Sequence, residues 1–124
     1  MSTPDTMTRY ARYAAIAWMT VIFALSSMPG DAVPAGDYGS YGHFFLYAVL
    51  GALYVLALPD GMPTARVVLL AVVLASAYGV TDELHQALVP GRVPDPADWL
   101  VDTAGACAGA AMGLLLARRA RRDR

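Results

Sequence analysis

Four long apolar stretches alternate along the chain with short intervals that hold most of the charged residues. The stretches cover residues 13–28, 41–58, 64–89 and 97–117. Each approaches the roughly 20 residues that a helix needs to cross a bilayer. A Pro-Gly or Pro-Asp-Gly breaker follows each of the first three stretches. The pattern predicts an all-α, polytopic membrane protein with four transmembrane helices in a single domain, 1–124.

The composition supports helices that face lipid rather than water. Hydrophobic residues make up 57% of the chain, and a soluble helical bundle would need polar helix faces that the first two stretches lack. The nine basic residues are all Arg and are outnumbered by ten acids, so there is no basic field for nucleic acid. Cys107 is the lone cysteine, which excludes an intramolecular disulfide framework and a Cys-based zinc site. We therefore expect the lipid bilayer as a partner and no nucleic acid.

The arginines predict the orientation of the four helices, because translocated loops are poor in Lys and Arg. Of the two loops that would face outward, 29–40 and 90–96, only the second holds an arginine, Arg92. The other eight lie at the opposite end: Arg9, Arg12, Arg66, Arg118, Arg119, Arg121, Arg122 and Arg124. We expect both termini in the cytoplasm (N-in/C-in) and a multi-pass protein of the cytoplasmic membrane.

The first stretch also fits a secretory signal peptide. Arg9 and Arg12 precede its apolar run, and small residues, among them Ala24 and Ser26, follow. Cleavage would leave three spans, so we favour an uncleaved anchor.

Polar and ionisable residues gather at the predicted outer ends of the helices. Such residues cost about 2.5–3.5 kcal/mol each at mid-helix, so they normally face a partner, a cavity or the surface. Helical spacing puts them on shared faces. We predict that they form a ligand-binding site: His43, Tyr47, Asp82, Glu83, Gln86, Arg92, Asp98 and Asp102. For Arg92, a salt bridge to a carboxylate is the alternative to contact with an anionic ligand group.

Three of the polar residues could also transfer protons. Glu83, His43 and His85 are the candidate catalytic residues, since carboxylates and imidazoles near an interface suit general acid–base work. The chain has no HExxH motif, phosphate-binding loop or nucleophile elbow. We therefore expect no metal and no cofactor.

Glycines at helical spacing indicate where helices pack closely. Gly105, Gly109 and Gly113 form two overlapping GxxxG steps below Asp102, and such steps let helices approach closely in lipid. The predicted packing residues are Gly51, Gly79, Gly105, Gly109 and Gly113. A homodimer through the 105/109/113 face is an alternative to packing inside one chain.

Two segments carry recognisable motifs. The stronger, at 77–113, reads AYGVTDELHQALVPGRVPDPADWLVDTAGACAGAAMG, and the other, at 41–51, reads YGHFFLYAVLG. Together they make the chain resemble the VanZ-like membrane proteins. The matching positions are His43, Tyr47, Leu50, Gly51, Asp82, Glu83, Gln86, Pro90, Gly91, Arg92, Asp98, Gly105 and Gly109.

The resemblance implies a small four-helix integral membrane protein, in a family named for a member linked to resistance to the glycopeptide teicoplanin. Two positions depart from the family pattern. Gly39 and Ser40 stand where the family often has an Asp-Lys pair, so an ionic role of that Lys cannot be carried over. Asp102 stands where the family often has Asn, which adds a negative charge to the site.

Four functions follow from these features. We favour a non-enzymatic cell-envelope protein that affects antibiotic resistance by binding a cell-wall or lipid-linked ligand, or the lipid anchor of a teicoplanin-type glycopeptide. The first alternative is an intramembrane enzyme acting on a lipid or envelope precursor, with Glu83 as general base and His43 or His85 sharing the proton transfer. A proton-coupled transporter ranks last, because the inner halves of the spans are almost wholly apolar. The remaining alternative is an accessory subunit whose polar cluster only locks the helix ends together.

Overall fold

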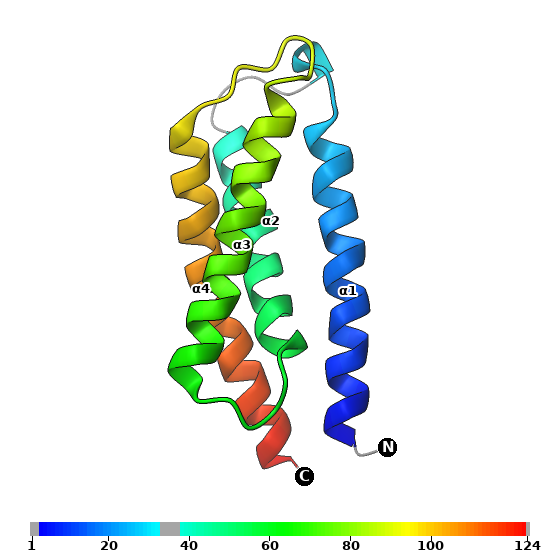
Figure 1. The fold of residues 1–124 in the computed structure, drawn as a ribbon, viewed down its shortest axis with the longest axis vertical. Coiled ribbons are helices and arrows are strands. Elements are labelled where there is room, and N and C mark those ends of the chain that lie inside the picture. Colours follow the sequence, from blue (N-terminus) through cyan, green and yellow to red (C-terminus); the bar gives the residue numbers. More distant parts are fainter. Residues whose placement is uncertain (1–2, 33–37, 124) are drawn as a thin grey trace.

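The computed structural model describes residues 3–32 and 38–123, which form an antiparallel bundle of four helices. Helix α1 spans Thr3–Ser26, α2 Tyr38–Ala57, α3 Thr64–Gln86 and α4 Pro96–Arg122, with a short 3₁₀ helix, Gly30–Ala32, after α1. The helices run alternately up and down, so that both ends of the chain lie at the same end of the bundle (Figure 1). The prediction of an all-α chain is confirmed. Part of the predicted outer loop, 33–37, lies outside the described residues.

Three of the helices are long and apolar enough to cross a membrane: α2 from Gly39, α3 and α4. Helix α1 is not among them, since Arg9 and Arg12 lie in its first half. The outward faces carry large exposed apolar side chains, including Phe45, Leu69 and Leu100. Such a surface suits lipid better than water. That α1 also crosses the membrane, as a fourth span, stays a prediction.

The helices differ from the apolar stretches mainly at their ends. Helix α1 begins ten residues before its apolar stretch, and α4 continues through most of the C-terminal arginines. Ala and Arg favour helix, so the backbone stays helical where the sequence no longer suits hydrocarbon. Helix α3 ends at Gln86, three residues earlier than its stretch. Hydropathy marks the part of a helix that lipid can cover, and helix propensity sets where the helix ends.

Helices α2 and α4 form the closest contact in the bundle, and glycine makes it possible. A Cβ atom at Gly51 would lie 2.5 Å from the Ala106 carbonyl oxygen. Cβ atoms at Gly105 and Gly109 would overlap the carbonyl oxygens of Phe44 and Ala48. The 105/109/113 face is therefore covered by α2 of the same chain, and a homodimer would need another surface.

A small apolar core lies beneath the polar end of the bundle. It is built from Ile22, Tyr47, Leu50, Ala75 and Ala106, one or more from each helix. Helix α1 is tied to this core by side chains that bond to backbone. The Trp18 indole donates to the Leu46 carbonyl at 2.8 Å, and the Tyr78 hydroxyl donates to the Met19 carbonyl at 2.7 Å. These bonds fix the height of α1 against α2 and α3.

Two Pro-Gly turns dock on each other above the helices. The Gly30 amide donates to the Pro90 carbonyl at 3.0 Å, and a Cβ atom at Gly30 would overlap the backbone of Gly91. Gly91 itself has a positive φ of 75°, which favours glycine. The α3–α4 loop then ends at Asp95, whose side chain caps α4 by accepting from the Ala97 amide. The docked turns close one end of the bundle.

We expect Gly109→Ala to destabilise the protein by about 3 kcal/mol or more, because the added methyl group would meet the α2 backbone, which cannot move aside. The matched control is Gly42→Ala on α2, where a Cβ atom meets nothing within 4 Å. That change should raise stability by about 0.5–1 kcal/mol, because alanine favours helix over glycine. Unfolding in mixed micelles, followed by circular dichroism, measures both. Equal stability of the two variants would contradict the close α2–α4 contact.

Candidate functional site

Buried polar side chains from α1, α3 and α4 meet near the docked turns. Ser26, Asp82, Gln86 and Asp102 are each at most 5% exposed. Helix α2 adds His43, which is half-buried among them. A buried polar group is costly unless it finds a hydrogen-bond partner. The partners of these five side chains therefore define the site.

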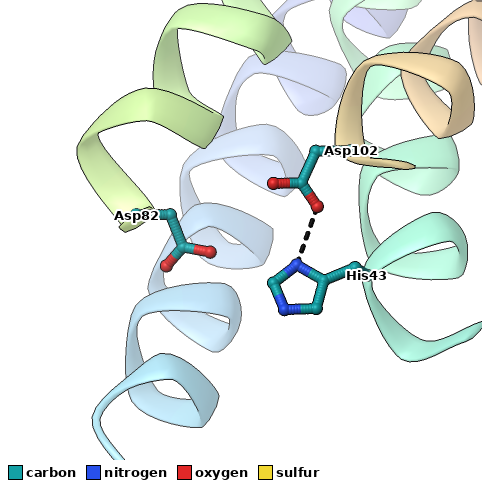
Figure 2. A group of neighbouring side chains, drawn as sticks. All are labelled: His43, Asp82 and Asp102. Atoms are coloured by element: carbon teal, nitrogen blue, oxygen red, sulfur yellow. Dashed lines mark hydrogen bonds and ion pairs between the residues drawn. The ribbon is translucent and has the colours of Figure 1, made fainter. Parts of the chain in front are cut away.

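His43 and Asp102 form the central contact. His43 Nδ1 lies 2.7 Å from Asp102 Oδ1, within ion-pair and hydrogen-bond distance. The contact joins α2 to α4, next to the glycines that bring those helices together. Figure 2 shows the Asp82 carboxylate across a gap from the same imidazole, on the neighbouring helix α3. Asp102 Oδ2 is fully buried and has no hydrogen-bond partner among the described residues.

Asp82 is held by hydroxyl groups from two other helices. Ser26 Oγ donates to Asp82 Oδ1, and the Tyr47 hydroxyl donates to Asp82 Oδ2 at 3.3 Å. Tyr47 is fully buried, so its position is fixed by the core. Two donors from two different helices give this carboxylate one orientation. Asp82 therefore presents its charge at a defined place beside His43.

Glu83 and Asp98 lie close to the same histidine. Ligand atoms of His43, Glu83 and Asp98 all lie within 4.8 Å of one another. Glu83 Oε2 accepts from the Asp95 amide at 3.2 Å, whereas Glu83 Oε1 has no partner in the described part of the chain. Glu83 also lines a surface hollow with Trp99 between α3 and α4. One imidazole is thus surrounded by four carboxylates.

Little positive charge balances these acids. Two full charges within 4.8 Å repel by at least about 3 kcal/mol at an effective dielectric constant near 20. Within 3–32 and 38–123, the other salt bridge besides His43–Asp102 joins Arg121 to Asp60 at the far end of the bundle. The carboxylates of Asp82, Glu83, Asp98 and Asp102, the acidic cluster, therefore have no arginine partner among the described residues, and a cation or protons would stabilise them.

A cavity of about 220 Å³ opens beside the cluster, between α1, α2 and α3. His43, Asp82 and Gln86 provide its polar wall. The Gln86 amide nitrogen is buried and has no acceptor among the described residues. Ser26 and Arg92 add two more polar groups, and the remaining lining is apolar or lacks a side chain: Leu25, Met28, Leu46, Gly39 and Gly42. The cavity thus combines polar groups and apolar walls in one space.

Arg92 reaches the cavity from the α3–α4 loop. Its Nη1 donates to the Met28 carbonyl at 3.2 Å, which places the guanidinium at the cavity wall. In the described part of the chain it forms no salt bridge with a carboxylate, and the salt-bridge alternative from the sequence stays a prediction, because Asp37 lies outside the described residues. The remaining guanidinium N–H groups stay available to an anion.

The structure divides the predicted binding residues into two groups. His43, Asp82, Gln86 and Arg92 line the cavity. The other four residues contact or lie near His43 or Asp82 but do not line the cavity: Tyr47, Glu83, Asp98 and Asp102. The remaining candidate for proton transfer, His85, lies apart from both groups. Its Nε2 is 2.8 Å from Ser27 Oγ, and its ring stacks on Phe23 with centroids 4.5 Å apart.

Sequence reasoning missed the contribution of α1 and of two glycines. Ser26 bonds to Asp82, but nothing in the sequence sets the register of α1 against α3. Gly39 and Gly42 face open space, where an added Cβ atom would meet nothing within 4 Å. The sequence carried no signal for this role, because a glycine that leaves space and a glycine that packs against a helix cannot be told apart without the fold.

Comparison with known proteins gives one positive result. A family model described as VanZ/LLP1 matches residues 11–117. Neither a curated protein nor a solved structure matches the chain. The matched range contains the four helices' apolar parts and every residue that lines the cavity.

We expect Ser26→Ala to destabilise the protein by about 1–3 kcal/mol, because it leaves a buried oxygen of Asp82 without its donor. The neighbouring Ser27→Ala is the matched control. Ser27 is exposed and contacts His85, so its loss should change stability by no more than about 0.5 kcal/mol. Unfolding midpoints in detergent compare the two serines. Equal changes in the unfolding midpoint would mean that the Ser26–Asp82 contact contributes nothing to stability.

Proposed function

Because the chain belongs to the VanZ/LLP1 family, we propose that this membrane protein binds the anionic headgroup of a lipid-linked cell-wall ligand in the cavity between α1, α2 and α3. Binding of this kind in the cell envelope would affect resistance to glycopeptide antibiotics, teicoplanin included. The observation that carries the proposal is the composition of the cavity, where unused donors meet apolar walls.

The unused donors support an anionic group. The Arg92 guanidinium has N–H groups beyond the one bonded to Met28. The buried Gln86 amide nitrogen has no acceptor in the described chain. A phosphate oxygen accepts from Arg and amide donors, and each such bond to a charged group contributes about 1.5–3 kcal/mol. Gln86 is the last residue of α3 and Arg92 lies in the loop that follows, so both donors come from positions next to the docked turns in the chain.

The size of the cavity supports a headgroup with its chain outside. Pockets for whole small ligands usually measure about 300–1,000 Å³, and this cavity holds about 220 Å³. A headgroup fits this volume, whereas a polyprenyl chain does not. The apolar wall includes Leu25 and Met28, which are also exposed on the outer surface of the bundle. An amphiphile could therefore bind with its chain in the membrane.

The proposal includes four membrane spans with both termini in the cytoplasm and the cavity facing outward. Helix α1 would be the fourth span. Its Arg12 side chain donates to the Ala57 carbonyl at the end of α2, so the two helices end their apolar parts at similar depth. The positive-inside bias of the arginines supports this orientation, and the shared end of the two termini is what an even number of spans requires (Figure 1).

Catalysis and transport have less support from the same geometry. Glu83, the candidate general base, lines the hollow beside Trp99, whereas His43 lines the cavity. Their side-chain atoms lie within 4.8 Å of each other, but Glu83 is not among the residues that line the cavity, so a headgroup there would contact His43 directly and not Glu83. The described core below the cluster is apolar, which gives protons no polar path toward the other end. A purely structural cluster remains the alternative, and it predicts no ligand.

We expect Gly42→Leu to abolish binding of a polyprenyl phosphate, because the new side chain fills open space at the cavity. Arg92→Ala should weaken binding by about tenfold or more through loss of a charge-assisted bond. Arg66→Ala, an exposed arginine at the opposite end, is the matched control and should bind as the wild type does. Native mass spectrometry of the detergent-purified proteins measures retained lipid. Equal retention by all four proteins, each folded by circular dichroism, would rule out this cavity.

The topology has its own test. A reporter that works only in the cytoplasm should be active when it is fused after Arg122 or in the 58–63 loop. A reporter that works only outside the cytoplasm should be active in the 90–96 loop. This follows from four spans and a cytoplasmic N-terminus. A cytoplasmic reporter signal from the 90–96 loop would invert the proposed orientation.

A further inference from the structure

We propose that His43, Asp82 and Asp102 form the ligand set of a divalent transition-metal ion at the inner wall of the cavity. The sequence predicts no metal, since it has no metal-binding motif. The ligands would come from α2, α3 and α4, one residue from each (Figure 2). Metal binding can be tested separately from lipid binding, because it needs only the protein and the ion.

The spacing of the three side chains fits one ion. Their candidate ligand atoms all lie within 4.8 Å of one another. Zn²⁺ binds imidazole nitrogen and carboxylate oxygen at about 2.0–2.2 Å in tetrahedral geometry, which puts ligand atoms roughly 3.3–3.6 Å apart. Around one ion, the 2.7 Å contact of His43 Nδ1 with Asp102 Oδ1 would have to open, and a separation near the 4.8 Å limit would have to close by about 1 Å, changes that side-chain rotation can supply.

A buried carboxylate oxygen without a partner points to a missing positive ligand. Asp102 is fully buried, yet its Oδ2 atom has no donor among the described residues. A buried unsatisfied carboxylate oxygen calls for an explanation such as a bound ion.

The surroundings would hold the carboxylate ligands in place. The Ser26 and Tyr47 hydroxyl groups orient Asp82, as hydrogen bonds to first ligands commonly do in metal sites. No arginine competes for these carboxylates in the described chain, and the sequence has no lysine. An ion would offset the mutual repulsion of Asp82 and Asp102. One imidazole with two carboxylates suits Zn²⁺ or Mn²⁺ better than Mg²⁺, which prefers oxygen ligands.

A second set of three lies nearby and must be distinguished. His43, Glu83 and Asp98 also have candidate ligand atoms within 4.8 Å. Both residues that this set would add to His43 are partly exposed, and Glu83 already accepts from the Asp95 amide. Asp82 and Asp102 are buried, and a carboxylate oxygen of Asp102 has no partner. The buried set is therefore the one we assign.

The test is equilibrium dialysis of the tag-free full chain in detergent against Zn²⁺, with the bound metal measured by mass spectrometry. The wild type should bind about one Zn²⁺ per chain and gain thermal stability from it. Asp102→Asn keeps the shape of the side chain and should lower the affinity at least tenfold. His43→Gln should do the same. Two variants should stay close to the wild type: Asp98→Asn, which affects only the second set, and His85→Gln, which removes the other histidine.

Three results would overturn the assignment. The wild type could bind no more Zn²⁺ than His43→Gln does. Binding could survive in both His43→Gln and Asp102→Asn. It could also be lost in Asp98→Asn and kept in Asp102→Asn. Thermal unfolding with and without Zn²⁺ separates a lost site from a lost fold, because a folded variant without the site melts with no Zn²⁺ shift. No lipid is present, so this result is independent of polyprenyl phosphate binding.

Discussion

The structure depends on the close approach of α2 and α4. Gly51, Gly105 and Gly109 let the two backbones meet where any side chain would collide with a carbonyl oxygen. In lipid there is little hydrophobic drive for helices to associate, so close packing of small residues must supply the attraction. The same approach brings His43 within 2.7 Å of Asp102. The packing contact and the polar contact are thus consequences of one helix pair, and a larger spacing would remove both.

The carboxylates around His43 lower the stability of the bundle, and their position at one end limits that cost. Four carboxylates around one imidazole repel each other, and burial strengthens the repulsion. The fold places them beneath the docked Pro-Gly turns at one end, beside an open cavity. Hydroxyl groups from Ser26 and Tyr47 satisfy Asp82 without adding charge. Atoms of Glu83 and Asp102 remain without partners in the described chain. A site that retains unsatisfied buried charge suits binding more than it suits stability, since apolar residues of similar size would pack at lower cost.

The cavity exists because α1 joins the other helices at a few points. Bonds from Trp18 and Tyr78 hold the middle of α1, and the contact of Ser26 with Asp82 holds its end. Around these points, glycines at 39 and 42 leave space on the facing side of α2. Polar groups of α2, α3 and the α3–α4 loop can therefore share one volume with apolar side chains of α1. This combination is what an amphiphilic ligand requires.

The sequence by itself determined the helices, their apolar character and the family. Hydropathy and Pro-Gly breakers are local properties, so they can be read without knowing the fold, and the motif around Asp82 and Asp98 is carried by adjacent residues. Helical spacing also placed His43, Asp82 and Asp102 on polar faces. Only the tertiary structure decided which faces meet. It paired His43 with Asp102, brought Ser26 to Asp82, turned Arg92 toward the Met28 carbonyl and left His85 against Phe23. These choices depend on the register and rotation of one helix against another, and periodicity within a single helix carries no information about either.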